Sequence, residues 1–166
     1  MPLTKKTITE LFADDKKSLQ MFVEGKREFH GTKRMMNNGE TWRTLYTFIR
    51  HDLVMMDNYA TIGNGDEIIE NSEYREYYEI YYEEATPSQL FGRDEKAMSS
   101  FIEGKNLFAG TQEKFYDGET FNVFYRLLDE NLIAINSYCT KNETDELGAY
   151  DAIIHETESN IIFKLK

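Results

Sequence analysis

Histidine and cysteine are the side chains that most often bind metals or act as nucleophiles, and this chain has few of them. The histidines His30, His51 and His155 are far apart in the sequence, and Cys139 is the single cysteine. Metal binding and nucleophilic catalysis both need several such groups in one place, and a lone cysteine excludes a disulfide within the chain. We therefore expect no catalytic residue, no bound metal and no cofactor. An enzyme with an unrecognised site is kept as an alternative.

Carboxylates are the abundant chemical groups of this chain. There are 30 acidic and 19 basic side chains, so the net charge is -11. Such a charge disfavours direct binding to nucleic acid or to an anionic membrane and favours a basic protein partner, although it also serves solubility. The N-terminus has no apolar stretch of the kind found in signal peptides, and no segment has the roughly 18 apolar residues of a membrane span. We expect a cytoplasmic protein.

The acidic and aromatic stretch at 72–85, SEYREYYEIYYEEA, has two structural interpretations. Its tyrosines at 74, 77, 78 and 81 follow the spacing of one helix face, whereas those at 74, 78 and 82 also fit the alternation of a strand. We favour a helix, because Ser72 can cap its first turn and glutamates in that turn suit the helix dipole.

Glutamates and tyrosines together suit a protein interface, because tyrosine combines a rigid apolar surface with a hydroxyl group. A tyrosine stripe on a helix is also typical of a buried core, with the glutamates on a solvated face. We predict a partner-binding surface formed by this stretch and by acidic residues of a hairpin in the second half of the chain. The predicted residues are Glu73, Glu76, Tyr77, Glu79, Tyr81, Glu83, Glu84, Glu113, Asp117, Glu119, Asp129 and Glu130.

An eleven-residue phrase occurs twice in the chain. FVEGKREFHGT at 22–32 returns as FIEGKNLFAGT at 101–111, which is 79 residues later. The two halves align in this register without a gap over about fifty residues, a pattern that indicates internal duplication. The sequence therefore predicts two tandem copies of one unit, residues 1–79 and 80–166, packed together as one compact molecule.

Each copy is expected to begin with two helices. Thr7 starts a capping-box pattern, which recurs at Thr86. A second helix is expected to begin near Asp15 and to end at Gly25, and again 79 residues later. Gly25 and Gly104 should both be helix C-caps with φ above zero.

Three strands are expected to follow the helices. Aromatic and β-branched residues fill 27–37, 40–50 and 53–61 and recur 79 residues on, with Asn-Gly and Asp-Gly pairs at the hairpin turns. The chain end, NIIFKLK, also indicates a strand. The predicted fold class is α+β, with N-terminal helices packed on a three-stranded antiparallel sheet in each copy.

Several hairpin positions change character between the copies, from basic in the first to neutral or acidic in the second. They are Lys33, Arg34, Arg43, Arg50 and His51 in the first copy and Gln112, Glu113, Asn122, Asp129 and Glu130 in the second. Such divergence is how two copies of one fold acquire different contacts, although drift produces it too.

The pattern F-[VI]-E-G-K-x-x-F-x-G-T, the G-E-T hairpin and the strand ends N-Y-A-T and S-Y-C-T resemble small α/β domains of bacteriophage and mobile-element proteins. That resemblance implies an anti-defence protein. The leading hypothesis is a non-enzymatic inhibitor, anti-CRISPR-like or anti-restriction-like, that uses carboxylates in place of phosphates to occupy a nucleic-acid-binding nuclease of the host cell. The alternative binding protein is an immunity protein or antitoxin for a basic toxin. The oligomeric state is left open.

Overall fold

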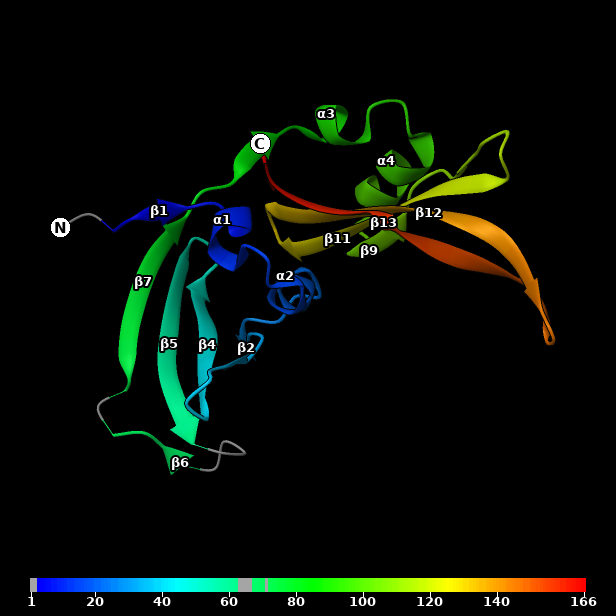
Figure 1. Ribbon diagram of the computed structural model, residues 1–166. Helices are drawn as coiled ribbons and strands as arrows, with labels where there is room; N and C mark the ends of the chain where they lie inside the picture. Colours follow the sequence, from blue (N-terminus) through cyan, green and yellow to red (C-terminus); the bar gives the residue numbers. More distant parts are fainter. Residues whose placement is uncertain (1–2, 63–66, 71) are drawn as a thin grey trace. The chain divides into compact units, whose positions relative to one another are not determined.

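The computed structural model describes residues 3–62, 67–70 and 72–166 of the chain. The chain forms two compact units, unit 1 (Met1–Tyr82) and unit 2 (Glu83–Lys166), so the boundary lies three residues after the predicted one at 79. The fold is mixed α+β, with many strands, few helices and two sheets (Figure 1). In the part of the chain that the structure describes, no helix has the length and apolar character needed to cross a membrane.

Unit 1 has two short helices beside a mainly antiparallel sheet. Its sheet has the order β1-β7-β5-β4-β2, with β3 also on β4 and β6 also on β5, and only the β1–β7 pair is parallel among the described strands. The elements are β1 (Lys5–Lys6), α1 (Ile8–Phe12), α2 (Lys16–Val23), β2 (Glu28–His30), β3 (Arg34–Met35), β4 (Glu40–Arg50), β5 (Leu53–Ile62), β6 (Glu67–Ile68) and β7 (Tyr74–Ile80).

Unit 2 also has two short helices and a mainly antiparallel sheet. Its strand order is β10-β11-β12-β13-β8, with β9 also on β11, and β8 pairs with β13 in parallel. The elements are β8 (Glu83–Ala85), α3 (Pro87–Phe91), α4 (Glu95–Ile102), β9 (Leu107–Ala109), β10 (Glu113–Lys114), β11 (Glu119–Asp129), β12 (Leu132–Asp145) and β13 (Gly148–Leu165).

The predicted strands at 40–50 and 119–129 have the bounds that the sequence indicated, and the chain end is a strand. The predicted strand at 27–37 is divided into β2 and β3. A sheet of three strands is an undercount, because β7 and β13 add a further antiparallel strand and β1 and β8 add a parallel edge strand.

The predicted helix at 72–85 is wrong. The stretch forms β7 and β8 instead, and β7 has hydrogen-bonded neighbours on both sides, β5 and β1. Ser72, which was expected to cap the helix, accepts a hydrogen bond from the Ala60 N–H at 3.1 Å and donates one to the Ile69 carbonyl at 2.6 Å. Backbone pairing along both edges therefore outweighs the local capping signal.

The helix starts follow the predicted capping boxes. Thr7 Oγ1 accepts from the Glu10 N–H at 3.1 Å, and Glu10 Oε1 accepts from the Thr7 N–H at 3.3 Å. Thr86 and Gln89 make the same two contacts at 3.2 and 2.9 Å. Each pair thus provides side-chain acceptors for two backbone N–H groups that would otherwise have no partner at the helix N-terminus.

The repeated phrase is explained by the way α2 and α4 end. Gly25 and Gly104 have φ of 91° and 83°, as predicted, but the C-caps are the preceding residues, Glu24 and Glu103. The Gly25 N–H donates to the Phe22 carbonyl and the Lys26 N–H to the Met21 carbonyl, at 3.0 and 3.1 Å. This pair of contacts is a Schellman motif, so the glycine of the phrase has a structural role.

The last two residues of the phrase tie the strand after each helix to the start of that helix. In unit 1, Thr32 donates its N–H to Asp15 Oδ2 at 2.9 Å and its hydroxyl to Asp15 Oδ1 at 2.7 Å. In unit 2, Thr111 makes the same contacts with Asp94 at 2.9 and 2.8 Å. Asp15 and Asp94 are the N-caps of α2 and α4. We call each Asp–Thr arrangement a cap lock.

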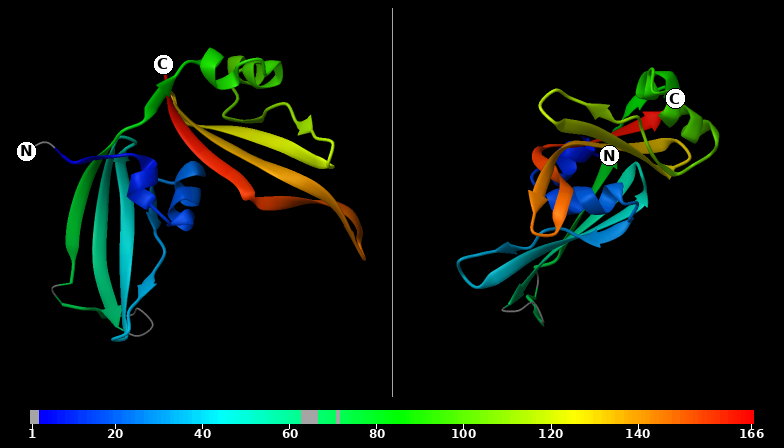
Figure 2. Two further views of the ribbon diagram at one scale, coloured as in Figure 1. Left: turned by 45° about the horizontal axis from the view of Figure 1, so that its top comes forward. Right: turned by 90° about the vertical axis from the view of Figure 1, so that its right-hand side faces the viewer.

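Aromatic side chains fill the space between helices and sheet in both units, and each helix pair lies on one face of its own sheet (Figure 2). In unit 1 the Phe12 ring contacts Phe29 and Tyr46, with centroids 6.0 and 5.2 Å apart. In unit 2 the Phe91 ring lies 5.0 Å from that of Tyr125. These edge-on and tilted contacts are the favourable geometries for aromatic pairs, and they hold the helices against the strands.

Candidate functional site

The stretch at 73–84 is divided between the two units. Glu73, Glu76 and Glu79 belong to unit 1, whereas Glu83 and Glu84 belong to unit 2. Within unit 1 successive side chains of β7 point to opposite faces of the sheet, so the glutamates at 76 and 79 lie on different faces. Tyr77 and Tyr81 are exposed.

The predicted acids of unit 2 form two groups at opposite ends of β11. Glu119 and Asp129 are ten positions apart on that strand, which corresponds to about 34 Å. Glu113 and Asp117 lie near the Glu119 end, in the β10–β11 hairpin. Glu130 follows Asp129 in the turn to β12, and the sheet register places Glu83 and Glu84 at that same end. The structure thus brings together only part of the predicted set.

A second acidic feature, which the sequence interpretation missed, is the hairpin formed by the far ends of β12 and β13. Residues 139–145 pair with 148–154, and residues 155–158 bulge from β13 opposite Tyr138 alone. We call residues 139–158 the acidic ribbon, visible at the far end of these two strands (Figure 1). It contains six acids and one lysine: Glu143, Asp145, Glu146, Asp151, Glu156, Glu158 and Lys141.

The acidic ribbon is exposed along its length. Every residue from 141 to 151 is exposed, and the side chain of Leu147 at the turn is 97% exposed. A two-stranded hairpin is at best marginally stable by itself in water, and this one has little of its surface covered within unit 2. The alternation of charged and small residues in KNETDELGAYDA, with Gly148 at the turn, is the sequence signal that could have identified it.

A hollow of about 570 Å³ lies in unit 1 beside α1 and the start of α2. Its volume is within the usual range of small-molecule sites. Trp42, Thr44, Asn58 and Tyr74 line it from three neighbouring strands, and we call it the unit 1 hollow. Asn58 pairs with Thr44 on one side and with Tyr74 on the other, so these three residues form one row across the sheet.

Asn58 is 8% exposed, and its amide is only half satisfied. Its Oδ1 accepts a hydrogen bond from the Thr44 hydroxyl at 2.9 Å, whereas its Nδ2 is buried without a hydrogen-bond partner among the described residues. A buried donor without an acceptor costs about 1–3 kcal/mol. This cost makes Asn58 an unusual residue for a purely structural position.

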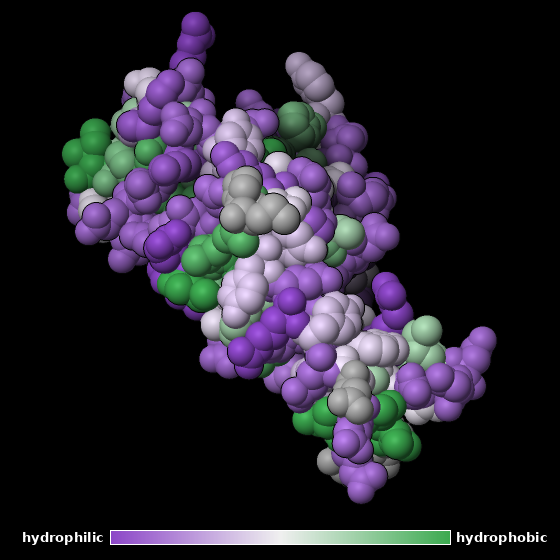
Figure 3. Space-filling model, turned by 90° about the vertical axis from the view of Figure 1, so that its left-hand side faces the viewer, coloured by the Kyte–Doolittle hydropathy of each residue, from purple (hydrophilic) through white to green (hydrophobic). Residues whose placement is uncertain are grey.

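The aromatic pair of the hollow covers the strand that carries Asn58. Trp42 is on β4 and Tyr74 is on β7, the two strands that flank β5. Their ring centroids are 6.3 Å apart in an edge-on arrangement, so the rings meet above β5. The face of the molecule shown in Figure 3 is largely hydrophilic, with apolar residues in separate patches.

Three cations, Lys33, Arg34 and Arg43, and two acids, the exposed Asp14 and the half-buried Asp15, line the hollow. Lys33 and Arg34 line it and are exposed, and Arg34 pairs directly with Trp42 and so lies on the same face of the sheet. Asp15 also lines the hollow, but its carboxylate already accepts four hydrogen bonds from Ser18 and Thr32. Burial raises the pKa of Asp15, and these hydrogen bonds lower it further than burial raises it, so that the pKa is below its ordinary value.

His30 is in β2, Cys139 in β12 and His155 in β13, and His51 lies in the turn between β4 and β5. His30 and His155 are exposed, and the His30 ring lies 3.3 Å from the Tyr59 hydroxyl. The cysteine, Cys139, is half-buried and donates its backbone N–H to Thr157 at 2.8 Å. Within residues 3–62, 67–70 and 72–166, no group of three or more His, Cys, Asp or Glu side chains is placed to hold a metal ion.

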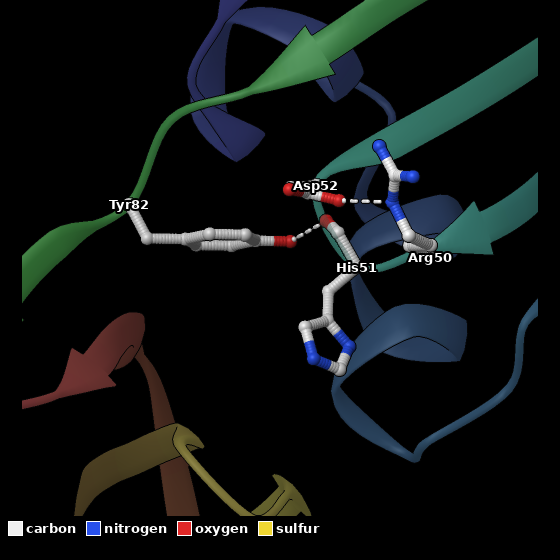
Figure 4. A network of polar contacts seen from close by, with 4 residues as sticks. All are labelled: Arg50, His51, Asp52 and Tyr82. Atoms are coloured by element: carbon white, nitrogen blue, oxygen red, sulfur yellow. Dashed lines mark hydrogen bonds and ion pairs between the residues drawn. The ribbon is translucent and has the colours of Figure 1, made fainter.

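The backbone carbonyl of His51 accepts a hydrogen bond from the last residue of unit 1. The buried Tyr82 donates its hydroxyl to the His51 carbonyl at 2.6 Å, beside an Arg50–Asp52 ion pair of 3.0 Å (Figure 4). Burial raises the pKa of Tyr82, and the nearby Asp52 carboxylate adds to this effect. Tyr82 is therefore a neutral donor that fastens the end of unit 1 to its β4–β5 turn.

No protein-family model, curated protein or solved structure matches this chain.

Proposed function

We propose that this chain is a non-enzymatic binding protein made of two copies of one α+β unit, and that it binds a basic protein surface through the acidic ribbon of unit 2. The observation that carries the proposal is the ribbon itself, an exposed two-stranded arm with six acids and one lysine. Unit 2 has 8 basic and 16 acidic residues, a net charge of -8, whereas unit 1 has 11 and 14, a net charge of -3; the two sum to the -11 of the chain.

The shape of the ribbon suits a nucleic-acid channel. Side chains on one face of a strand recur about every 6.8 Å, and an antiparallel ribbon is narrow enough to enter a major groove. A protein channel that is wide enough for a nucleic-acid duplex is therefore wide enough for this arm. The positive charge of such a channel also attracts the acids of the ribbon. Together with the resemblance to phage anti-defence domains, this supports a nucleic-acid-binding nuclease as the partner. An inhibitor of that kind acts by occupying the channel, so that nucleic acid cannot enter it.

Support for the two-copy part comes from matching contacts 79 residues apart. The two cap locks, the two capping boxes and the parallel edge strands β1 and β8 recur in the two units. A further match, 85 residues apart, is Ser72 in unit 1 and Thr157 in unit 2: each hydroxyl accepts from a backbone N–H and donates to a carbonyl.

The test is capture from a bacterial lysate by the immobilised full-length protein, with elution by salt and identification by mass. We expect a nucleic-acid-binding nuclease that elutes below about 0.5 M salt, because exposed charge pairs are screened within about 8–10 Å at physiological ionic strength. Added duplex DNA should displace it. The variant Glu143→Lys, Asp145→Lys, Glu146→Lys, Asp151→Lys should reduce capture by about tenfold or more.

The matched control reverses four acids of unit 1, Asp14→Lys, Glu28→Lys, Glu67→Lys and Glu70→Lys, and should leave capture almost unchanged. Asp15 is unsuitable as a control, because it caps α2. Equal loss in both variants would contradict a role of the ribbon. Capture of a basic toxin that DNA does not displace would favour the immunity-protein alternative over a nuclease inhibitor.

A further inference from the structure

We propose that the unit 1 hollow binds a nucleoside monophosphate, with the base against Trp42 and Tyr74 and the phosphate at Arg34 and Lys33. This site is separate from the acidic ribbon, and its residues all belong to unit 1. The inference rests on three observations: an aromatic pair, an unsatisfied amide donor beneath it, and two exposed cations at the rim.

The aromatic pair favours a planar ring. Trp42 and Tyr74 meet edge-on across β5, and a purine or pyrimidine that parts them gains two stacking faces. Stacking of bases on aromatic side chains, together with a positively charged groove, provides sequence-independent binding in single-stranded nucleic-acid sites. A flat ligand fits this arrangement better than a branched aliphatic one.

The amide of Asn58 favours a ring that carries a hydrogen-bond acceptor. Because the Thr44 hydroxyl already donates to Oδ1, the group that Asn58 can still offer is its Nδ2 donor. Ring nitrogens and carbonyls of all four bases are acceptors, and Asn commonly pairs with base edges. A bound base would therefore satisfy the donor that the free protein leaves unpaired.

The rim favours an anion. Arg34 is on the same face as Trp42, and Lys33 precedes it in the β2–β3 connection. Arg is well suited to phosphate because its planar guanidinium can form two parallel hydrogen bonds. The carboxylate of Asp15 is occupied by four hydrogen bonds within the cap lock, so it competes little for these cations. Asp14 also lines the hollow and is exposed, so the lining keeps three cations, with Arg43, against one exposed acid.

Unit 2 supplies a natural comparison for each of these features. Phe121, Val123 and Ser137 stand 79 residues after Trp42, Thr44 and Asn58. Ser137 pairs with Ser159, in the place where Asn58 pairs with Tyr74. The second aromatic ring and the free amide are thus missing in unit 2, and Glu113 replaces Arg34.

The test uses the single tryptophan of the chain as the reporter, because Trp42 lines the hollow. AMP, UMP, adenosine and inorganic phosphate are titrated into the full-length protein, and Trp42 emission is followed with excitation where nucleotides do not absorb. We expect saturable changes with AMP and UMP, about tenfold weaker binding of adenosine, and no change with inorganic phosphate alone.

Two variants separate the parts of the site. Arg34→Glu should weaken AMP binding about tenfold and leave adenosine binding unchanged, whereas Lys5→Glu, an exposed lysine on β1, should change neither. The double variant Thr44→Val, Asn58→Ser should abolish binding of both ligands without lowering the melting temperature, because it removes a donor that is unpaired in the folded protein.

A folded protein whose Trp42 emission does not respond to AMP or UMP at millimolar concentration would overturn the proposal. So would displacement of AMP by inorganic phosphate at equal concentration, which would indicate an anion site without recognition of the base. Neither outcome depends on the ribbon, and a ribbon variant that loses protein capture should still bind AMP.

Discussion

Unit 1 and unit 2 share a contact at Ser72 and at Thr157, but they differ in the length of the chain that leads to it. Ser72 and Thr157 each accept a hydrogen bond from the backbone of the neighbouring strand, at Ala60 and at Cys139. Eleven residues lie between Ala60 and Ser72, but seventeen lie between Cys139 and Thr157. The six additional residues of unit 2 lie in the segment that forms the acidic ribbon, where residues 141–151 are exposed.

The two units also differ where unit 1 has its hollow. The packing residues on either side are alike, with Phe12 and Tyr46 in unit 1 and Phe91 and Tyr125 in unit 2. The row across the sheet, by contrast, changes from Thr44, Asn58 and Tyr74 to aliphatic or small residues. Unit 1 therefore has a hollow with an unpaired amide donor and unit 2 has an exposed acidic ribbon, although the contacts that support them are similar.

The cap locks are the contacts that should be hardest to change in either unit. A Cβ added at Gly31 would lie 2.7 Å from Asp15 Oδ2, and one added at Gly110 would lie 2.5 Å from both Asp94 Oδ2 and Val123 Cγ1. We expect Gly31→Ala and Gly110→Ala to lower the free energy of unfolding by about 3 kcal/mol, because each overpacks the site and displaces a capping carboxylate. Urea denaturation measures the effect.

The larger loss should come from Gly110→Ala, because the branched Val123 side chain can move less than the Tyr46 ring edge, which lies 3.0 Å from the added atom at Gly31. A loss below about 1 kcal/mol in one unit alone would show that the two locks are not equivalent. A useful reference is alanine at the exposed Gly39, where φ is 85° and the new Cβ meets nothing within 4 Å.

Much of this local structure could be predicted from the sequence. The capping boxes, the glycines after α2 and α4 and the long central strands all depend on residues close together in the chain. The stretch at 72–85 could not be assigned in that way, because its partners β5 and β1 are distant and its local spacing fits two structures.

The functional features were harder to predict for a similar reason. The unit 1 hollow needs Trp42, Asn58 and Tyr74 to meet across three strands, and only the sheet register brings them together. Nearly all of the acidic ribbon falls after the stretch in which the two halves align without a gap, so comparison of the two halves gave no signal for it. The acidic residues that charge alone predicted to form one surface are divided between the two units, and those of unit 2 lie at the two ends of β11.

A smaller effect should distinguish the two cap locks. Asp94 accepts three hydrogen bonds, and Asp15 accepts a fourth from the Ser18 hydroxyl at 2.7 Å, where unit 2 has Ala97. We expect Asp94→Ala to cost about 2 kcal/mol and Asp15→Ala about 1 kcal/mol more, because the fully buried Ser18 hydroxyl loses its acceptor. Urea denaturation of both single variants measures the difference. The double variant with Ser18→Ala and Asp15→Ala should lose about as much stability as Asp94→Ala.

Low pH is a control for these two variants. Burial raises the pKa of each carboxyl, but hydrogen bonds from the backbone and from Thr32 or Thr111 lower it more, so both pKa values are lowered in the folded state. The resulting stability is complete above the unfolded pKa of about 3.9 and is lost as the pH falls through the folded value. The gap between wild type and Asp→Ala should therefore narrow below about pH 4, and a constant gap would contradict a role of the charge.

The smallest expected effect, and the only stabilising one, is at the end of α1. Ala13 has φ 48° and ψ -116°, and Gly92 has φ 55° and ψ -116° at the end of α3. This backbone region suits glycine but strains alanine by about 1–3 kcal/mol, whereas glycine loses about 0.4–1 kcal/mol through the greater freedom of the unfolded chain. Ala13→Gly should therefore stabilise the protein by about 1 kcal/mol and Gly92→Ala should destabilise it by a similar amount, as measured by thermal and urea denaturation.

Since Ala13 lines the unit 1 hollow, AMP titration of Ala13→Gly adds a second measurement. Unchanged affinity with raised stability would mean that the strain is incidental, and weaker affinity would mean that the strained turn helps to hold the hollow open.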